Sequence, residues 1–400
     1  MIRSNREPDG PARPDGLDAA FSVPFVHRLR FCDDALGGQS RVLADLLIGE
    51  GGEPGAVLPV VDGGLLEADP SLADRLADLA RNHRGEFRFT GAPHVLPGGE
   101  AGKNGWQATQ ALLGRIADDR LDRRGYVLAI GGGAALDVAG FAASLAHRGL
   151  RLVRMPSTTL AQADSGVGVK NGVNAFGQKN FLGVFAPPWA VVNDWALLNT
   201  LDARRWREGF VEAVKVALIK DRSLFERIER DADAIVRRQP APSRHVVRRS
   251  AELHARHIAE GGDPFETTAA RPLDFGHWAA HRLEVATGFR LGHGEAVAIG
   301  LALDSAYAAR VGMLDDDDLQ RIVDLLERLG FRLGDPALAE PDELMLGLEQ
   351  FREHLGGPLT VTLPQRIGVG RDVHEIDPGA MRQAIGAIAA RARAAAPSPG

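Results

Sequence analysis

Three side chains in the C-terminal half of the chain are of the types that bind a catalytic metal ion. Glu212 lies in the mostly apolar segment GFVEAVKVALIK, and His277 and His293 each follow a glycine, in DFGHWAAH and LGHGEAVA. One carboxylate and two imidazoles leave coordination positions open for a substrate, which is typical of catalytic sites. Taken singly, either histidine is more simply explained as a surface or hydrogen-bonded core residue. Their convergence in space is therefore a prediction.

The lysines form a second group with chemical potential. Of the 47 lysines and arginines only five are lysines, and these are Lys103, Lys170, Lys179, Lys215 and Lys220. Because an ammonium has a tunable pKa and a guanidinium does not, a chain that prefers arginine is expected to keep lysine where this difference matters. Lys215 follows Glu212 by one helical turn, and we expect this pair to face a polar cleft. Chance survival of five lysines is the alternative.

A glycine turn could bind a nucleotide. Gly131, Gly132 and Gly133 follow an apolar run and precede a helical stretch, so their backbone could approach a pyrophosphate at a helix N-terminus. Asp137, four residues further on, could accept hydrogen bonds from ribose hydroxyls. The spacing does not match the GxGxxG pattern, and glycine turns after strands are common. A structural turn remains the alternative.

The stretch from Met155 to Pro188 is dense in Gly, Asn, Ser and Thr and has little periodicity. More than thirty such residues are long for a passive loop, so we expect a binding function. Lys170, Lys179 and Asn180 could together bind a phosphate, with the ammonium groups supplying the charge. A glycine-rich connector is the simpler alternative.

The scaffold that must position these residues is predicted from apolar periodicity. Up to about residue 195, short apolar runs alternate with helical stretches, which is typical of a parallel sheet. We expect strands over 56–62, 125–130, 150–156 and 189–194, and helices over 71–81 and 134–146. Further along the chain helical periodicity dominates. The prediction is an α/β Rossmann-like domain at 21–202, an all-helical metal and substrate domain at 203–390, a cleft between them, and disordered tails at 1–20 and 391–400.

Composition limits the class of protein. The chain has 400 residues, 44% of them hydrophobic, which suits a globular protein of about two domains. A formal net charge of −6 gives no reason to expect nucleic acid or an anionic membrane as partner. Cys32 is the single cysteine, so no intrachain disulfide forms and a reducing compartment is favoured. Because no apolar run is long enough for a signal or a membrane span, we expect a cytoplasmic protein.

In their order and spacing these motifs resemble those of the 3-dehydroquinate synthase family, from about Asp62 to Gly368. The HGEAVA element is matched letter for letter at His293 to Ala298, and the family's GHTFGH resembles Gly276 to His281. Less specific matches cover the GGGxxxD turn, the arginine-to-aspartate segment 148–164, the lysines that end VGVK and QKN, the Glu212 and Lys215 pair, and GExxK at 100–103. No single element is specific, but the ordered set is.

The resemblance implies a dehydroquinate synthase-like fold and a role for each matched residue. Zinc or cobalt would be bound by Glu212, His277 and His293. NAD would be bound by Asp62, Glu100, Lys103, Gly131, Gly132, Gly133, Asp137, Ser157, Thr158 and Lys179. Catalysis and phosphate binding would fall to Asp164, Lys170, Asn180, Lys215 and His281. A homodimer is implied as well, in which Arg148 reaches the site of the neighbouring subunit.

The chemistry that the resemblance implies is a cyclisation of a small sugar phosphate. NAD oxidises a metal-bound hydroxyl, phosphate is eliminated, the hydride returns, and an intramolecular aldol reaction closes a carbocycle. A carbonyl formed next to a C–H bond makes that proton acidic, and the substrate phosphate can act as the base. The net reaction is that of a carbon-oxygen lyase.

Departures from the family pattern concern the substrate. The family's arginine and asparagine that hold a substrate carboxylate, seven and three residues before the first histidine of GHTFGH, are Ala270 and Asp274 here. An aspartate facing a carboxylate is repulsive, so we expect a ketose phosphate such as sedoheptulose 7-phosphate. Arg271 could compensate for Ala270. By counting back from His277, Arg256 replaces the family's active-site lysine.

Further departures keep alternatives open. Arg352, in FREH, takes the place of a late lysine pair, and this element resembles the branch that includes the 2-epi-5-epi-valiolone synthases. That branch typically lacks the second histidine of GHTFGH, which His281 retains, so a third branch is indicated. The alternatives are a genuine 3-dehydroquinate synthase that binds the carboxylate through Arg271 and Arg256, a metal-dependent polyol dehydrogenase, and a ligand-binding relative without turnover.

Overall fold

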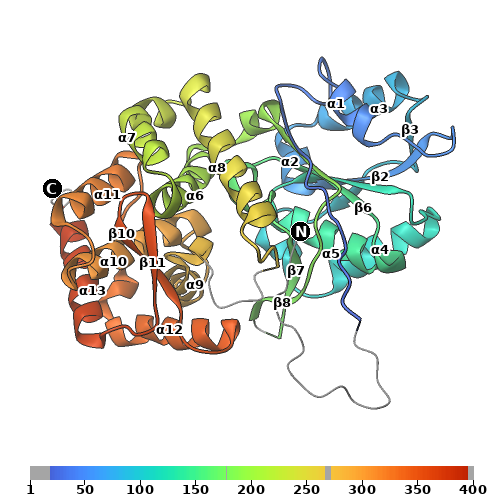
Figure 1. The fold of residues 1–400 in the computed structure, drawn as a ribbon. Coiled ribbons are helices and arrows are strands. Elements are labelled where there is room, and N and C mark those ends of the chain that lie inside the picture. Colours follow the sequence, from blue (N-terminus) through green and yellow to red (C-terminus); the bar gives the residue numbers. More distant parts are fainter. Residues whose placement is uncertain (1–18, 177, 266–271, 395–400) are drawn as a thin grey trace, which may run out of the picture.

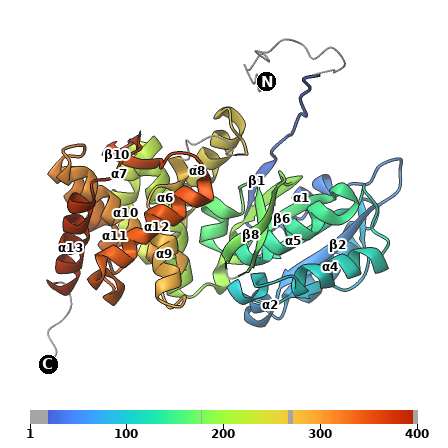
Figure 2. The ribbon, with the colours of Figure 1, turned by 90° about the horizontal axis from the view of Figure 1, so that it is seen from below.

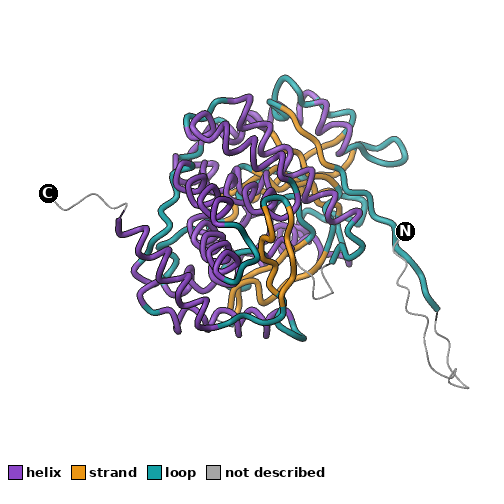
Figure 3. Tube along the Cα trace, turned by 60° about the vertical axis from the view of Figure 1, so that its left-hand side comes forward, coloured by secondary structure: helices purple, strands orange, loops and turns teal. Residues whose placement is uncertain are grey.

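The computed structural model describes residues 19–176, 178–265 and 272–394, and places an α/β domain beside a helical domain (Figure 1). Most strands gather in the first domain and most long helices in the second (Figure 3). Seen from below, the two domains meet along a junction where the β8 strand lies (Figure 2). Most of the predicted N-terminal tail, and the last six residues of the C-terminal one, lie outside the described residues.

The first domain is built on a parallel sheet in the order β1-β9-β6-β5-β2-β3, with β4 also paired to β2. Every pair in this sheet is parallel. The strands are β1 Leu29–Cys32, β2 Gly55–Asp62, β3 Phe87–Phe89, β4 His94–Leu96, β5 Tyr126–Gly131, β6 Arg151–Pro156 and β9 Ala190–Asp194. The helices are α1 Arg41–Leu46, α2 Gly63–Ala68, α3 Leu72–Asn82, α4 Gln107–Asp118 and α5 Gly133–Leu145.

Burial on both faces explains why the sheet strands are apolar runs. On β5, Leu128 and Ile130 pack with α1, α2 and α3 in one core, whereas Val127 and Ala129 pack with α4 and α5 in another. Alternate side chains of a strand point to opposite faces, so a strand covered on both sides must be apolar throughout. The strands and helices predicted between residues 56 and 195 are all present, within one or two residues of their expected ends.

The segment 155–188 is more regular than its sequence suggests. A π-helical turn spans Ala161–Ser165, and β7 Lys170–Ala175 pairs antiparallel with β8 Gln178–Phe185. The hairpin lies outside the main sheet, and none of the described residues of β8 is fully buried. In β8, Leu182 and Val184 are half-buried against the core formed with α4 and α5, but the glycine and polar residues around them gave no clear strand signal.

The second domain contains α6 Ala203–Lys220, α7 Arg222–Val236, α8 Pro240–Glu260, α9 His277–Ala286, α10 His293–Arg310, α11 Asp316–Arg328, α12 Pro341–Leu355 and α13 Pro378–Ala394. α10 is almost entirely buried and forms the centre of the domain's core. Among the residues that the structure describes, no helix is both long and apolar enough to cross a membrane.

Two expectations for this domain were wrong. It is not all helical, because β10 Val361–Arg366 and β11 Val369–Val373 form an antiparallel hairpin. Pro364 lies within β10, and a proline argues against a strand because it has no amide to donate. The tail predicted from residue 391 also starts too early, since α13 continues to Ala394.

α6 is locked to the first domain by a close backbone contact. The buried hydroxyl of Thr159 donates to the Trp206 carbonyl at 2.8 Å and accepts from the Gly209 amide at 3.1 Å. A Cβ on Gly209 would lie 2.2 Å from the Thr159 carbonyl carbon, so only glycine permits this approach. The contact sets the position of the helix that carries Glu212 and Lys215 against the π-helical turn.

We predict that Gly209→Ala lowers the free energy of unfolding by about 1–3 kcal/mol, because the added methyl group overpacks a backbone contact. Gly386→Ala is the matched control, since Gly386 lies on α13 with no atom near its Cβ position. That control should stabilise the protein by up to about 1 kcal/mol through helix propensity. Urea unfolding of both variants measures the difference, and a Gly209→Ala protein as stable as the parent would contradict the prediction.

Candidate active site

The structure brings the three predicted metal ligands together. Nε2 of His277 lies 3.8 Å and Nε2 of His293 lies 3.4 Å from Oε1 of Glu212. One ligand atom from each residue falls within 4.8 Å of the other two. They come from α6, α9 and α10, three packed helices of the second domain. Helices fix ligand positions more firmly than loops do, which suits a preorganised site.

The environment of these three side chains fits a divalent cation. Nδ1 of His277 is 3.0 Å from the Phe275 carbonyl, and Nδ1 of His293 is 3.3 Å from a carboxylate oxygen of Glu284. With Nδ1 donating in both rings, both Nε2 lone pairs face Glu212. Oε1 of Glu212 is buried and accepts no hydrogen bond from any described residue. An oxygen and two nitrogens with free lone pairs are ligands that zinc and cobalt accept.

Lys215 supplies the compensating positive charge. Its ammonium lies 2.6 Å from Glu212 and 3.3 Å from Asp164, and its side chain is 2% exposed. Burial lowers the pKa of Lys215, but Asp164 and Glu212 outweigh burial and raise the pKa above its usual value. For Glu212, burial acts to raise the pKa, but the ammonium of Lys215 outweighs burial and holds the pKa low. All three groups are therefore charged, and the pair faces the site as expected.

Asp164 extends this chain of charges to α8. It lies on the π-helical turn, and its Oδ1 is 2.6 Å from Nδ1 of His254, which is buried on α8. π-Helical turns are rare and frequently found at functional sites. Both α6 and α8 pack against this turn, so one carboxylate of the first domain is contacted by side chains from two helices of the second.

Asp274 lies three residues before the predicted metal ligand His277. Burial raises the pKa of Asp274, but Lys170, followed by His277, Lys215 and His281, outweighs burial and holds the pKa low. The His281 ring centroid is 5.5 Å from that of His277. Asp274 is therefore ionised close to the metal cluster.

The predicted nucleotide residues gather at the carboxyl ends of β2, β5 and β6. Asp62, the last residue of β2, accepts from the Gly64 amide at 2.8 Å and lies 3.4 Å from the Gly132 amide. The Ser157 amide donates to the Gly131 carbonyl at 2.8 Å. Gly133 begins α5, and Thr158 caps the turn that follows β6. Ligands of parallel sheets bind at this edge, where helix N-termini stabilise negative charge.

The 100–103 segment docks against α5 and the β7–β8 hairpin. Lys103 is buried and forms an ion pair with Asp137 of α5. Glu100 accepts from the side-chain amide of Asn174 at 3.1 Å. The Asn174 side chain in turn accepts from the backbone amide of Asn180 at 2.9 Å, and Asn180 has a left-handed φ of 55°. These predicted cofactor and phosphate residues form one connected surface.

Lys179 crosses the domain junction. Its ammonium is 2.8 Å from Oε1 of Glu284, whose other oxygen contacts His293. The hairpin and the metal cluster are thus joined through one buried carboxylate.

Of the four predicted substrate-binding arginines, three are exposed and the fourth lies outside the described residues. Arg256 is exposed on α8, and Arg352 is exposed and paired with Glu349 on its own helix α12. Arg148 is exposed before the start of β6, at the sheet edge opposite to Ser157 and Thr158. Arg271 lies outside the described residues. The role of Arg256 in substrate binding therefore stays a prediction.

Sequence reasoning also missed three buried side chains that touch site residues. His254, two residues before Arg256 on α8, contacts Asp164. Glu284 follows His277 by two helical turns, a spacing that puts both on one helix face and could have revealed it. Arg154 is fully buried in β6 and donates to the carbonyls of Gly166, Gly168 and Lys170 at 2.8–3.1 Å. A charged residue inside an apolar strand was the available signal.

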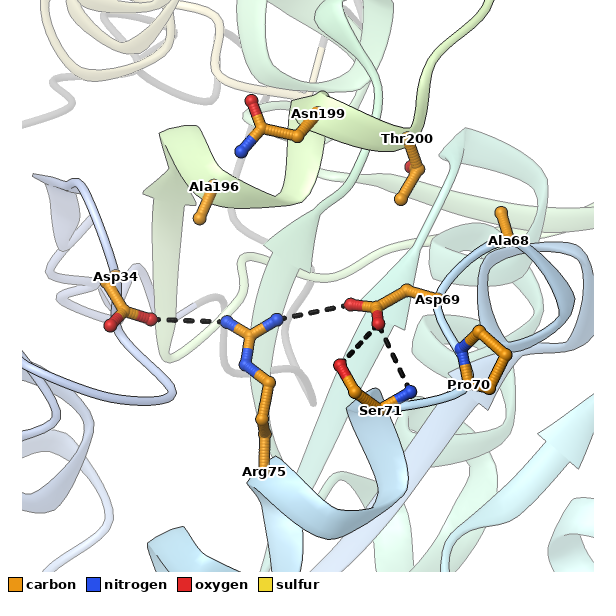
Figure 4. A pocket seen from close by; sticks show the side chains of 9 residues that line it. All are labelled: Asp34, Ala68, Asp69, Pro70, Ser71, Arg75, Ala196, Asn199 and Thr200. Atoms are coloured by element: carbon orange, nitrogen blue, oxygen red, sulfur yellow. Dashed lines mark hydrogen bonds and ion pairs between the residues drawn. The ribbon is translucent and has the colours of Figure 1, made fainter.

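A separate recess of about 630 Å³ lies between α2, α3 and the turn after β9 (Figure 4). Arg75 crosses it and pairs at 3.2 Å with both Asp34 and Asp69. None of its lining residues belongs to the predicted site, and its only lining guanidinium is already neutralised.

Fold and site together define the class: a two-domain protein in which a nucleotide-type parallel sheet and a helical domain meet at an open Glu/His/His cluster. Residues 93–208 match the 3-dehydroquinate synthase N-terminal family profile, and residues 209–348 match the 3-dehydroquinate synthase C-terminal profile. The chain belongs to the 3-dehydroquinate synthase family. The resemblance drawn from its motifs and the two-domain fold class are confirmed.

Similar proteins within this family carry two different names. A 2-epi-5-epi-valiolone synthase from Streptomyces glaucescens is 38% identical over 304 residues, covering 75% of this chain and 78% of that protein. A 3-dehydroquinate synthase from Rhodopseudomonas palustris is 37% identical over 300 residues, covering 72% and 78%. The solved 2-epi-5-epi-valiolone synthase from Streptomyces hygroscopicus, with NAD+ and Zn2+ bound, has a TM-score of 0.84 at 29% identity, covering 94% of this chain and all of that one.

We predict that Glu212→Gln weakens zinc binding by more than about 100-fold, because loss of a direct ligand exceeds the 10–100-fold cost of outer-shell changes. Competition with a chromogenic chelator measures the dissociation constant. Glu226→Gln is the matched control, since Glu226 is an exposed partner of Arg222 on α7 and should leave zinc binding unchanged. Equal zinc affinity in Glu212→Gln and the parent would contradict the assigned cluster.

Proposed function

We propose that the chain is an NAD- and divalent-metal-dependent sugar-phosphate cyclase that eliminates phosphate from a ketose phosphate without a carboxylate. Membership of the 3-dehydroquinate synthase family supports the reaction class. The feature that carries the substrate class is Asp274, which ends the turn before α9 and whose pKa Lys170 and His277 hold low against the effect of burial. A substrate carboxylate placed against it would add a like charge with little solvent screening.

The residues of the chain divide the work of such a reaction. When bound, the metal would polarise a substrate hydroxyl, and NAD would accept and return a hydride. Glu212, His277 and His293 would hold the metal. Lys215 and Asp164 keep opposite charges fixed beside it, so the polar environment needs no reorganisation as charge develops.

Phosphate binding is assigned to the side of the site formed by the hairpin. Lys170 and Asn180 lie on β7 and β8, and His281 lies beside the metal ligand His277. An ammonium, an amide and an imidazole can each donate to phosphate oxygens, and a departing phosphate needs such donors as its charge grows. This surface faces the metal cluster through Asp274 and Lys170.

We predict phosphate release from sedoheptulose 7-phosphate, but not from the seven-carbon acid phosphate of the 3-dehydroquinate synthases, with zinc and NAD supplied. Asp274→Asn should then raise the relative kcat/KM for the acid by about tenfold or more, because removal of one repulsive charge is worth about 1.4 kcal/mol. Asp45→Asn, which removes an exposed carboxylate from α1, is the control. Efficient turnover of the acid by the parent would overturn the substrate assignment and favour a genuine 3-dehydroquinate synthase.

The same assay tests the dehydrogenase alternative. A cyclase of this kind regenerates NAD in each turnover, so absorbance from NADH should stay far below the amount of product. NADH formed in proportion to product, without phosphate release, would identify a polyol dehydrogenase instead.

We further infer a cytoplasmic homodimer in which each site takes Arg148 from the other copy. Arg148 precedes β6, whereas Ser157 and Thr158 follow it, and a six-residue strand spans about 20 Å. Arg148 therefore cannot reach the carboxyl edge of its own sheet. In a dimer with twofold symmetry, the sheet edge that carries Arg148 in each copy can lie against the other copy. The absence of nucleic-acid and membrane partners remains a prediction from net charge.

We predict that two inactive variants, Arg148→Ala and Glu212→Ala, regain about a quarter of the parent activity when unfolded together and refolded, because half of the dimers are mixed and each has one intact site. Mixing Glu212→Ala with Lys170→Ala is the control, because both residues belong to the same copy's site and no intact site can form. Equal recovery in both mixtures, or none in either, would contradict the shared site.

A further inference from the structure

Glu284 is a buried carboxylate that contacts both a predicted metal ligand and a side chain of the hairpin. It lies on α9 with 3% of its surface exposed. Its Oε1 is 2.8 Å from the ammonium of Lys179 on β8, and its Oε2 is 3.3 Å from Nδ1 of His293 on α10. A buried carboxylate is costly unless it is paired, and here the two partners come from different domains.

The contact with His293 has a consequence for the metal cluster. An imidazole that donates from Nδ1 keeps its lone pair on Nε2, which in His293 lies 3.4 Å from Glu212. His277 is oriented by a backbone carbonyl, which side-chain substitution does not remove. The orientation of His293 therefore depends on a replaceable side chain, and that side chain is Glu284.

The contact with Lys179 has a consequence for the hairpin. β8 lies on the surface, and its cation Lys179 reaches the helical domain through Glu284. The same hairpin carries Lys170 and Asn180, and through Asn174 it contacts Glu100. Each oxygen of the Glu284 carboxylate thus has a partner on a different side of the domain junction.

We propose that Glu284 is a positioning residue that couples the metal cluster to the β7–β8 hairpin, orienting His293 with one oxygen and holding Lys179 with the other. Zinc on Nε2 of His293 strengthens the Nδ1–H donor, which fixes the carboxylate in the orientation that Lys179 needs. Metal binding then favours the hairpin docked on the helical domain, and by linkage a docked hairpin favours metal binding. The proposal rests on the proposed function only in that the cluster binds a metal.

The first test measures zinc binding to the purified chain in the absence of substrate. Glu284→Ala should weaken zinc binding by about 10–100-fold, as loss of a carboxylate behind a histidine ligand does elsewhere. Glu284→Gln, which preserves volume, should show a smaller loss and serves if the alanine variant does not fold. Glu343→Gln is the matched control, because Glu343 pairs with Arg282 of the same helix α9 at the surface. Zinc affinity in Glu284→Ala within threefold of the parent would overturn the proposal.

The second test asks whether the coupling reaches the hairpin. Zinc should slow amide hydrogen exchange across residues 170–185 in the parent, and this protection should be lost in Glu284→Ala and in Lys179→Met. Lys179→Met should also weaken zinc binding, and its effect should not add to that of Glu284→Ala. Unchanged hairpin exchange on zinc addition to the parent, or fully additive effects, would overturn the coupling. Neither test uses turnover, so a wrong substrate assignment would leave both results intact.

Discussion

The site depends on a row of buried charges of alternating sign at the junction of the two domains. Asp164, Lys215 and Glu212 carry minus, plus and minus in sequence, with exposed side-chain fractions of 14%, 2% and 0%. Removing Lys215 would leave two buried carboxylates without this cation in a region with little solvent screening, which is far more costly than replacing the whole set. The first domain contributes one of these charges and the second contributes two. Asp164 therefore reaches Lys215 only when the two domains meet correctly.

The fold was largely predictable because its determinants are local. A doubly covered parallel sheet requires apolar strands, and runs such as the one ending at Ile130 have no other simple explanation. The hairpins were not predictable in this way. β8 has no fully buried residue among those described, and β10 contains Pro364, so neither carries a clear strand pattern. Long-range pairing decides such elements, and a single sequence does not display it.

The site was predictable in its residue types more than in its positions. Glu212, His277 and His293 were recognisable because few side chains bind metals, and helices α6, α9 and α10 do bring them together. Arg256 was assigned by counting along the chain, whereas the side chain of α8 that contacts Asp164 is His254. Two residues on an α-helix are separated by a rotation of about 200°, so these two side chains leave the helix on opposite faces. Glu284 escaped notice because its two partners, Lys179 and His293, are 105 and 9 residues away.

The loop before β7 is held in its conformation by Arg154, a side chain that lies outside the loop. This fully buried guanidinium, located in the central strand β6, donates to the carbonyls of three alternate residues, Gly166, Gly168 and Lys170, and to the side chain of Asn171. The conformation of the loop that ends at Lys170 is therefore set by hydrogen bonds from β6 rather than by the loop's own residues. The loop can adopt this conformation only once β6 is in place between β5 and β9. The part of the site that the first domain contributes is therefore completed after the sheet has formed. For an engineer, grafting the 165–171 sequence onto another scaffold would transfer the residues without the shape.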